Sequence, residues 1–145
     1  MKHIICLMLI GAASLYGAET KVRLQDTPAA VQKTVQAETK NATMVGITKE
    51  VEKGKTVYEL ETKVDGKARD LLIRSDGSVL SVEQEVTLDS IPEGARAAIT
   101  KRAAGGSVKK VETVKENGNV AYEAELVVKG KPTEVKVAAD GTPVK

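Results

Sequence analysis

The chain has one histidine and one cysteine, and both lie within its first six residues. It has no Phe and no Trp, so three Tyr are its only aromatic residues. If the N-terminal segment is removed on export, the mature chain has neither an imidazole nor a thiol. This excludes Ser-His-Asp and Cys-His catalysis, a His-Cys zinc site and a disulfide. We therefore expect no enzyme and no cofactor, and a fold stabilised by packing alone.

Residues 1–18 have the order of a secretory signal peptide. Lys2 and His3 form a short basic start, residues 4–10 are apolar, and residues 11–18 are mostly small. We expect cleavage between Ala18 and Glu19, with cleavage after Gly17 as the near alternative. The apolar run is too short to span a bilayer. The mature protein is thus expected in the periplasm or secreted, without a stable membrane anchor.

The formal net charge is only +2, and basic and acidic residues are interspersed along the chain. This balance gives no reason to expect nucleic acid or an anionic membrane surface as partner.

The chain matches itself when it is shifted by 64 positions, which aligns residues 24–81 with 88–145 without a gap. The shared residues are mostly turn formers and core formers, as duplication of a structural unit would leave. We therefore predict two repeats, 19–86 and 87–145. The matches include Leu24/Leu88, Pro28/Pro92, Gly54/Gly118, Tyr58/Tyr122, Glu59/Glu123, Gly66/Gly130 and Asp76-Gly77/Asp140-Gly141.

Each repeat is predicted to begin with a helix, over about 28–40 and 92–104. Thr27 is the expected N-cap of the first, with Pro28 at the first helical position. Four strands separated by Gly turns follow in the first repeat. In the second repeat the fourth strand is only a stub at 142–145. This order predicts an α+β fold of two tandem α-β-β-β-β units, each a helix packed on a small antiparallel sheet. Because a unit of about 60 residues is marginal on its own, we expect the two units to pack together or share a sheet.

The strands that contain Tyr58 and Tyr122 are expected to be half-buried. Tyr58, Leu60, Thr62 and Val64 share one face, and Tyr122, Ala124, Leu126 and Val128 share the corresponding one. In the first strand of each repeat, Val45, Ile47 and Val51 are expected on one face, whereas Val108, Val111 and Val114 require a bulge.

The helix with Leu24-x-x-x-Pro28, the strand Tyr58-Glu-x-Glu61 and the turns Asp65-Gly-Lys67 and Asp76-Gly77 resemble the PepSY-like family of exported bacterial domains. That family is related in shape to the β-lactamase inhibitor proteins (BLIP). The resemblance implies a periplasmic or secreted protein that binds or inhibits another protein. PepSY units also occur in propeptides of thermolysin-type metallopeptidases, which makes a peptidase one possible target. The chain lacks the cysteines and aromatic-rich concave surface of BLIP, so a β-lactamase target is not carried over.

The candidate binding face consists of Glu59, Glu61, Glu123 and Glu125, on the strand faces opposite the tyrosines. The simplest interpretation of these carboxylates is a solvated sheet face. The functional interpretation is a surface for a protein partner whose identity stays open. An alternative is an envelope-homeostasis protein that binds a small molecule or metal ion weakly through surface carboxylates.

Overall fold

The computed structural model describes residues 19–52 and 54–144. The predicted signal peptide, with Ala18 at its end, lies outside the described residues. Among the residues described, no helix is both long and apolar enough to cross a membrane.

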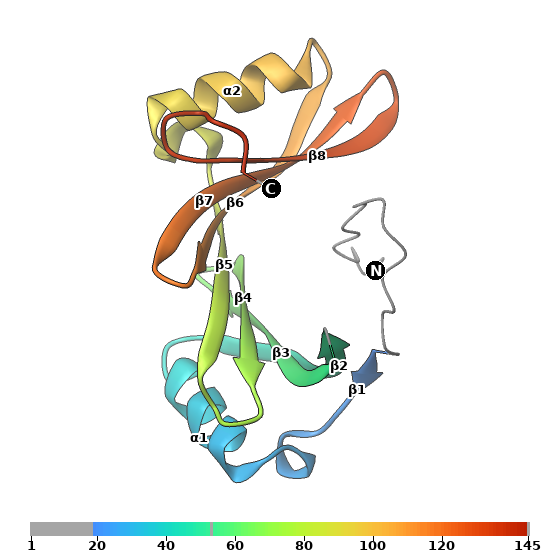
Figure 1. Cartoon of the computed structure of the whole chain (residues 1–145), viewed down its shortest axis with the longest axis vertical. Coiled ribbons are helices and arrows are strands. Elements are labelled where there is room, and N and C mark those ends of the chain that lie inside the picture. Colours follow the sequence, from blue (N-terminus) through green and yellow to red (C-terminus); the bar gives the residue numbers. More distant parts are fainter. Residues whose placement is uncertain (1–18, 53, 145) are drawn as a thin grey trace.

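All strands belong to one antiparallel sheet in which the spatial order follows the chain order, β1 to β8 (Figure 1). Two short 3-10 turns, Leu24–Asp26 and Leu88–Ser90, precede the two helices. The elements are β1 (Thr20–Lys21), α1 (Ala29–Glu38), β2 (Thr43–Glu52), β3 (Lys55–Val64), β4 (Lys67–Arg74), β5 (Val79–Val86), α2 (Glu93–Ala103), β6 (Ser107–Glu116), β7 (Asn119–Val128) and β8 (Lys131–Val137).

The prediction of two tandem α-β-β-β-β units, each with its own sheet, is wrong. β5 pairs with β6 from Ser81↔Glu116 to Val86↔Val111, so a single eight-stranded sheet runs through the molecule. The physical reason is that separate sheets would expose the N–H and C=O groups of both strands as free edges. The predicted fourth strand at 142–145 is reduced to an isolated bridge between Val137 and Pro143.

The helices begin one residue later than expected. Pro28 and Pro92 are the N-cap residues, and neither makes a side-chain capping bond. Thr27 is not the cap, because its hydroxyl donates to the carbonyl oxygen of Leu24 at 2.7 Å and so stabilises the preceding 3-10 turn. α1 ends at Glu38, earlier than the predicted residue 40.

Both helices pack on the same face of the sheet. Directly opposite residues of paired strands share a face, and by this rule the strand residues packed under α1 and those packed under α2 lie on one side of the sheet. α1 and α2 lie toward opposite ends of the long axis (Figure 1). They cover two separate hydrophobic cores. The α1 core contains Val31, Val35, Ile47, Tyr58, Leu60, Leu71 and Ile73. The α2 core contains Ile91, Ala95, Ile99, Ala103, Val111, Ala124, Leu126, Val135 and Val137, with Tyr122 packed against it half-buried.

The predicted inward face of β3 and β7 is thereby confirmed, but that of β2 is only partly right. A register shift between Met44 and Gly46 turns Val45 outward, where it is 57% exposed, whereas Ile47 is buried. The bulge expected in β6 is present, between Val108 and Lys110, and it puts Val108 and Val111 on the helix face. Val114 lies on the opposite face, so the expectation that all three valines share a face is wrong.

Two Asp-Gly turns fix the helices to the sheet. In each turn the Asp carboxylate accepts a backbone N–H and a hydroxyl bond, at 2.9 and 2.6 Å, from Ser78 or Thr142. The glycines, with φ of +83° and +87°, touch helix backbone. A Cβ on Gly77 would lie 2.6 Å from the carbonyl oxygen of Ala30, and one on Gly141 would lie 2.5 Å from that of Gly94.

Candidate functional site

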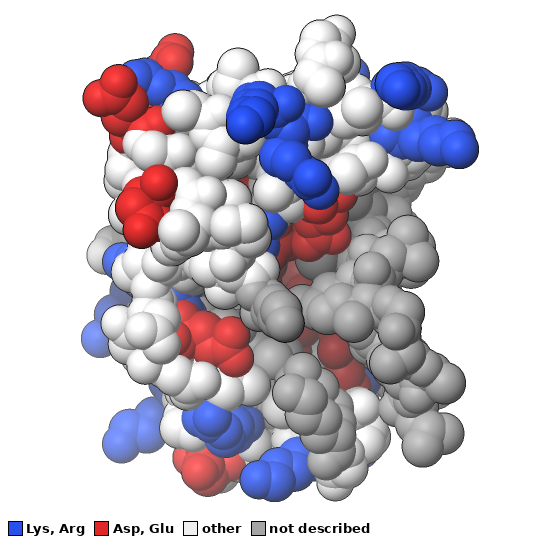
Figure 2. Space-filling model, turned by 45° about the horizontal axis from the view of Figure 1, so that its top comes forward, with Lys and Arg blue, Asp and Glu red and all other residues white. Residues whose placement is uncertain are grey.

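The sheet face opposite the helices is rich in carboxylates, and no described helix or strand packs on it. We call it the acidic face. The strand register places on it Glu50, Glu59, Glu61, Asp70, Glu83, Glu85, Glu112, Glu116, Glu123, Glu125 and Glu134. The cations that share it are Lys21, Lys55, Lys63, Arg74, Lys110 and Lys136. Figure 2 shows several acidic side chains in the middle of the side in view, with both basic and acidic side chains toward its upper and lower ends.

The four glutamates predicted from the sequence all lie on this face, as two pairs on β3 and β7 that are separated by β4, β5 and β6. Glu59, Glu61 and Glu125 are half-buried, and Glu123 is only 6% exposed. They are therefore less solvated than the simple solvated-face interpretation expects. Whether they contact a partner stays a prediction.

Three carboxylates form a row across β3, β4 and β5. Glu61 lies directly opposite Asp70, and Asp70 lies directly opposite Glu83. Like charges in such cross-strand positions destabilise a sheet. None of the ion pairs between described residues involves these three side chains. The sheet thus keeps a repulsive arrangement that its fold does not require.

A second row crosses β5 to β8 and ends in a cation. Glu85, Glu112 and Glu123 are directly opposite one another in turn, and Lys136 lies opposite Glu123. Here lysines neutralise part of the charge. Lys110 Nζ lies 2.6 Å from Glu112 Oε1, and Lys136 Nζ lies 3.7 Å from Glu123 Oε2.

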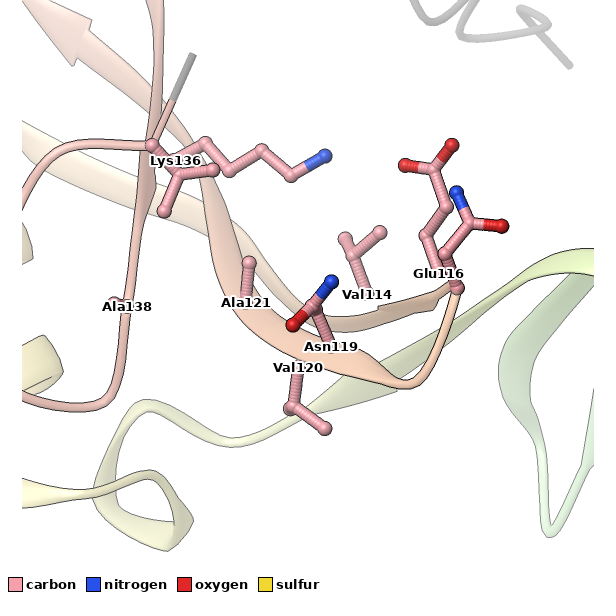
Figure 3. A pocket seen from close by; sticks show the side chains of 9 residues that line it. Val114, Glu116, Asn119, Val120, Ala121, Lys136 and Ala138 are labelled. Carbon is pink, nitrogen blue, oxygen red and sulfur yellow. The ribbon is translucent and has the colours of Figure 1, made fainter.

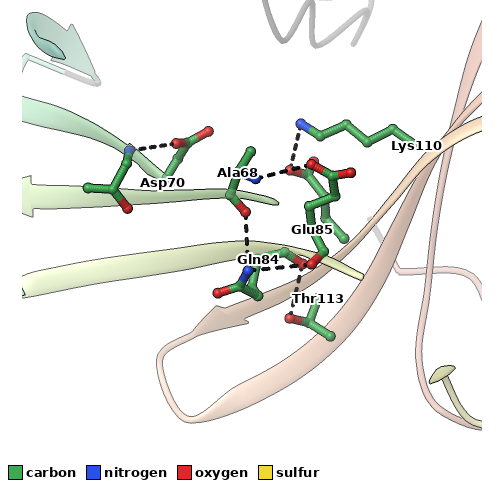
Figure 4. Close-up of polar contacts among 8 residues, drawn as sticks. Ala68, Asp70, Gln84, Glu85, Lys110 and Thr113 are labelled. Carbon is green, nitrogen blue, oxygen red and sulfur yellow. Dashed lines mark hydrogen bonds and ion pairs between the residues drawn. The ribbon is translucent and has the colours of Figure 1, made fainter. Parts of the chain in front are cut away.

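Backbone donors hold two of the carboxylates in place (Figure 4). The Thr62 N–H donates to Asp70 Oδ1 at 3.3 Å, and the Ala68 N–H donates to Glu85 Oε2 at 3.1 Å. Behind them, on the helix face, Gln84 Nε2 donates to the carbonyl oxygen of Ala68 at 3.2 Å. These bonds orient the two side chains within the rows.

Burial and mutual repulsion raise the pKa values of carboxyls on this face. The pKa of Glu59 rises to about 8, first because burial disfavours its charged form and then because Glu50 lies beside it. The pKa of Glu83 rises to about 7 through burial, with Glu112, Glu123 and Asp70 adding to it.

Two further carboxyls behave in the same way. The pKa of Glu123 rises to about 7 through burial and a hydrogen bond with Glu134, although Lys136 acts against the shift. The pKa of Asp70 is also raised by burial, against the lowering influence of the Thr62 N–H and Lys110. Near neutral pH the acidic face therefore holds protons that a nearby positive charge would displace.

A shallow depression of about 430 Å³ lies on the acidic face at the β6–β7 hairpin. Figure 3 shows Val114, Ala121 and Asn119 directed to the same side as the long side chains of Glu116 and Lys136. Val114 and Ala121 are buried and give the depression an apolar floor. Such a site offers an aliphatic surface with charged groups around it.

The described residues do not include a group of three or more His, Cys, Asp or Glu side chains arranged to hold a metal ion. The rows spread their carboxylates along the sheet instead of converging on one point. The arrangement suits contact with an extended or broad surface better than coordination of a single ion.

Sequence reasoning identified the carboxylates that two strands, β3 and β7, contribute to this face and missed those of the other strands. Asp70, Glu83, Glu112 and Glu134 escaped it because each was considered within its own strand. The signal was the alternation of Glu83 and Glu85 along residues 79–86, which were predicted as the last strand of the first repeat, with no partner strand from the second.

No protein-family model and no curated protein sequence matches this chain. Several crystal structures share its fold at low identity. A DUF2874 family protein from Bacteroides uniformis has a TM-score of 0.67 at 15% identity, over 82% of this chain and 87% of the other. A protein described as a candidate periplasmic protein, from Bacteroides eggerthii, has a TM-score of 0.66 at 17% identity, over 82% and 86%.

A BLIP-like protein from Bacteroides fragilis has a TM-score of 0.61 at 18% identity, over 82% of this chain and 84% of its own. At this identity the likeness shows the fold alone. It supports the BLIP-like part of the family resemblance, whereas the PepSY assignment stays a prediction.

Proposed function

We propose that this chain is an exported module that binds another protein through the acidic face and performs no reaction on it. The observation that carries the proposal is that both helices cover one face of a continuous sheet, while no described element covers the other. A broad, preformed sheet surface with repulsive rows of carboxylates is costly to keep without a use.

The comparisons support this proposal at the level of fold. One neighbour is described as BLIP-like and another as a candidate periplasmic protein. Together with the basic, apolar and small-residue order of residues 1–18, they favour the periplasm as the place of action. Inhibition of a peptidase is the form of this function that the PepSY-like resemblance suggests.

A site-specific photo-crosslinker tests the face. A benzoyl-phenylalanine at Glu61, in the carboxylate row across β3, β4 and β5, is compared with one at Gln36, which is exposed on α1. Irradiation in a periplasmic extract is expected to give adducts of discrete mass from position 61 and none of these from position 36. The same adducts from both positions, or none from position 61, would remove the acidic face as the binding surface.

A further inference from the structure

On the basis of the proposed function, we infer that the partner presents a Lys- and Arg-rich segment that lies across the carboxylate rows of the acidic face. One of its long basic side chains occupies the depression beside Glu116. The partner class is thus a cationic protein segment.

The first argument is charge complementarity. Five of the six cations on the face lie at its margin: Lys21 and Lys136 are on the two outermost strands, and Lys55, Lys63 and Arg74 are at or next to strand ends. Lys136 and the one inner cation, Lys110, already pair with Glu123 and Glu112. The row of Glu61, Asp70 and Glu83 is left with no ion pair among the described residues. A row of positive charges from outside would neutralise it.

The second argument is the spacing of the row. Its three carboxyls come from neighbouring strands, which lie about 4.8 Å apart in a sheet. Side chains on one face of an extended peptide repeat every two residues, or about 6.6 Å. Long, flexible Lys and Arg side chains can match this small difference, so an extended basic segment can place successive charges over the row.

The depression at the β6–β7 hairpin supports a basic side chain by its shape and its apolar floor, in addition to charge. Its floor of Val114 and Ala121 suits the methylene stem of Lys or Arg, while Glu116 at its edge suits the charged head group. Lys136, which also lines the depression, is paired with Glu123. A purely apolar side chain would fill the floor but leave the carboxylate desolvated, which costs free energy.

Other ligand classes fit less well. Nucleic acid and other polyanions are repelled by the carboxylate rows. A single divalent cation lacks a converging set of three acidic side chains among the described residues. Binding of a metal instead of a basic segment is therefore an outcome that the experiment has to distinguish.

The test uses a fluorescein-labelled twelve-residue peptide of alternating Arg and Ser, with a Glu-and-Ser peptide as the anionic control. Binding is measured by anisotropy at pH 8 in low and high salt. The row variant carries Glu61→Gln, Asp70→Asn and Glu83→Gln. The matched variant, Asp65→Asn, Asp89→Asn and Glu93→Gln, removes the same charge from exposed acids that lie outside the carboxylate rows.

We expect the Arg peptide to bind the wild type, with Kd weakened about tenfold or more in the row variant and about twofold or less in the matched variant. High salt should weaken binding to the wild type more than to the row variant. Equal losses in the two variants, or binding of the Glu peptide, would overturn the inference. So would Arg-peptide binding that 1 mM Ca²⁺ or Mg²⁺ abolishes at constant ionic strength.

The inference about a basic segment can be wrong even if the proposed protein-binding function is right. If position 61 crosslinks to a protein whose capture the row variant and high salt leave unchanged, the face binds protein but not through basic residues. If position 61 gives no adduct at all, the proposed function itself is wrong.

Discussion

Glu112 and Glu123 lie directly opposite each other on β6 and β7, and each is only 6% exposed. Their nearest cations come from different elements, Lys110 from β6 and Lys136 from β8. Two like charges therefore face each other on neighbouring strands, and each is paired with its own lysine. This arrangement makes the folded protein sensitive to both pH and charge substitution.

The first prediction concerns pH. The folded-state pKa values of Glu83, Glu123 and Glu59 are about 7, 7 and 8, above the usual value near 4.5. The folded state thus binds more protons than the unfolded state between about pH 5 and pH 8. Stability from these groups is fully present below their unfolded pKa and is lost as pH rises through the folded one.

We therefore expect the free energy of unfolding to fall by about 1–3 kcal/mol from pH 5 to pH 8, after allowance for solvent screening. Urea denaturation at four pH values between 5 and 8 measures this fall in the free energy of unfolding. Glu83→Gln should flatten the profile, whereas Glu93→Gln, an exposed change on α2, should leave it unaltered. A profile that rises between pH 5 and pH 8 would contradict the prediction.

The second prediction compares the two faces of β3. Tyr58 is 6% exposed within the α1 core, so Tyr58→Ala should cost about 3 kcal/mol. Glu59→Ala removes a carboxyl that Glu50 repels, so it should cost about 0.5 kcal/mol or less. Denaturation of both variants at pH 7 measures their free energies of unfolding. A larger loss of stability in the Glu59 variant would show that the buried and polar faces of β3 are assigned the wrong way round.

The third prediction concerns the turns that touch the helices. Gly77→Ala places a Cβ 2.6 Å from a backbone oxygen, and Gly141→Ala places one at 2.5 Å. Each should destabilise by about 2–4 kcal/mol, because backbone has to move. Gly66→Ala is the matched control, with a similar φ of +79° and open space around it, and should cost about 1 kcal/mol. Equal losses at positions 66 and 77 would show that contact with the helix is unimportant.

The fourth prediction follows from the continuous sheet. A fragment of residues 19–86 ends at β5, whose partner strand β6 is then absent. The exposed edge should make the fragment associate or unfold, whereas the mature chain stays monomeric at the same concentration. Size-exclusion chromatography and circular dichroism measure both properties. A monomeric fragment that melts cooperatively would show that the first half folds independently.

The fifth prediction concerns export. Intact-mass measurement of the exported protein should give an N-terminus at Glu19, or at Ala18 if cleavage follows Gly17. Retention of Met1 in a soluble cytoplasmic fraction would contradict the predicted localisation.

The alternation of Tyr58, Leu60 and Thr62 predicted the inward face of β3, because period 2 fixes which side chains share a face. The turns at Asp65-Gly66 and Asn117-Gly118 were equally readable, and all four residues have positive φ. The pairing of β5 with β6 was not readable. Strand pairing depends on which sheet edges meet in space, and the sequence of neither strand contains a signal that identifies its partner.

The same limit explains what was missed in the acidic face. Glu59 and Glu61 were visible as one strand's polar side, but the row from Glu61 to Glu83 exists only through the register of three strands. The nearly neutral net charge gave no indication of this carboxylate row, because composition does not show on which face of a sheet a charge lies.

The two hydrophobic cores share no residue, and between them the helix face carries Gln84 and Thr113, opposite each other on β5 and β6. The middle of the sheet is thus backed by polar side chains. Its curvature is set by the backbone ladder of these two strands more than by packing behind it. The acidic face is thus backed by one packed core on each side of a polar seam at Gln84 and Thr113. The fit of a partner that spans the seam depends on the angle between the two halves of the face, whereas the fit of a partner confined to one half does not.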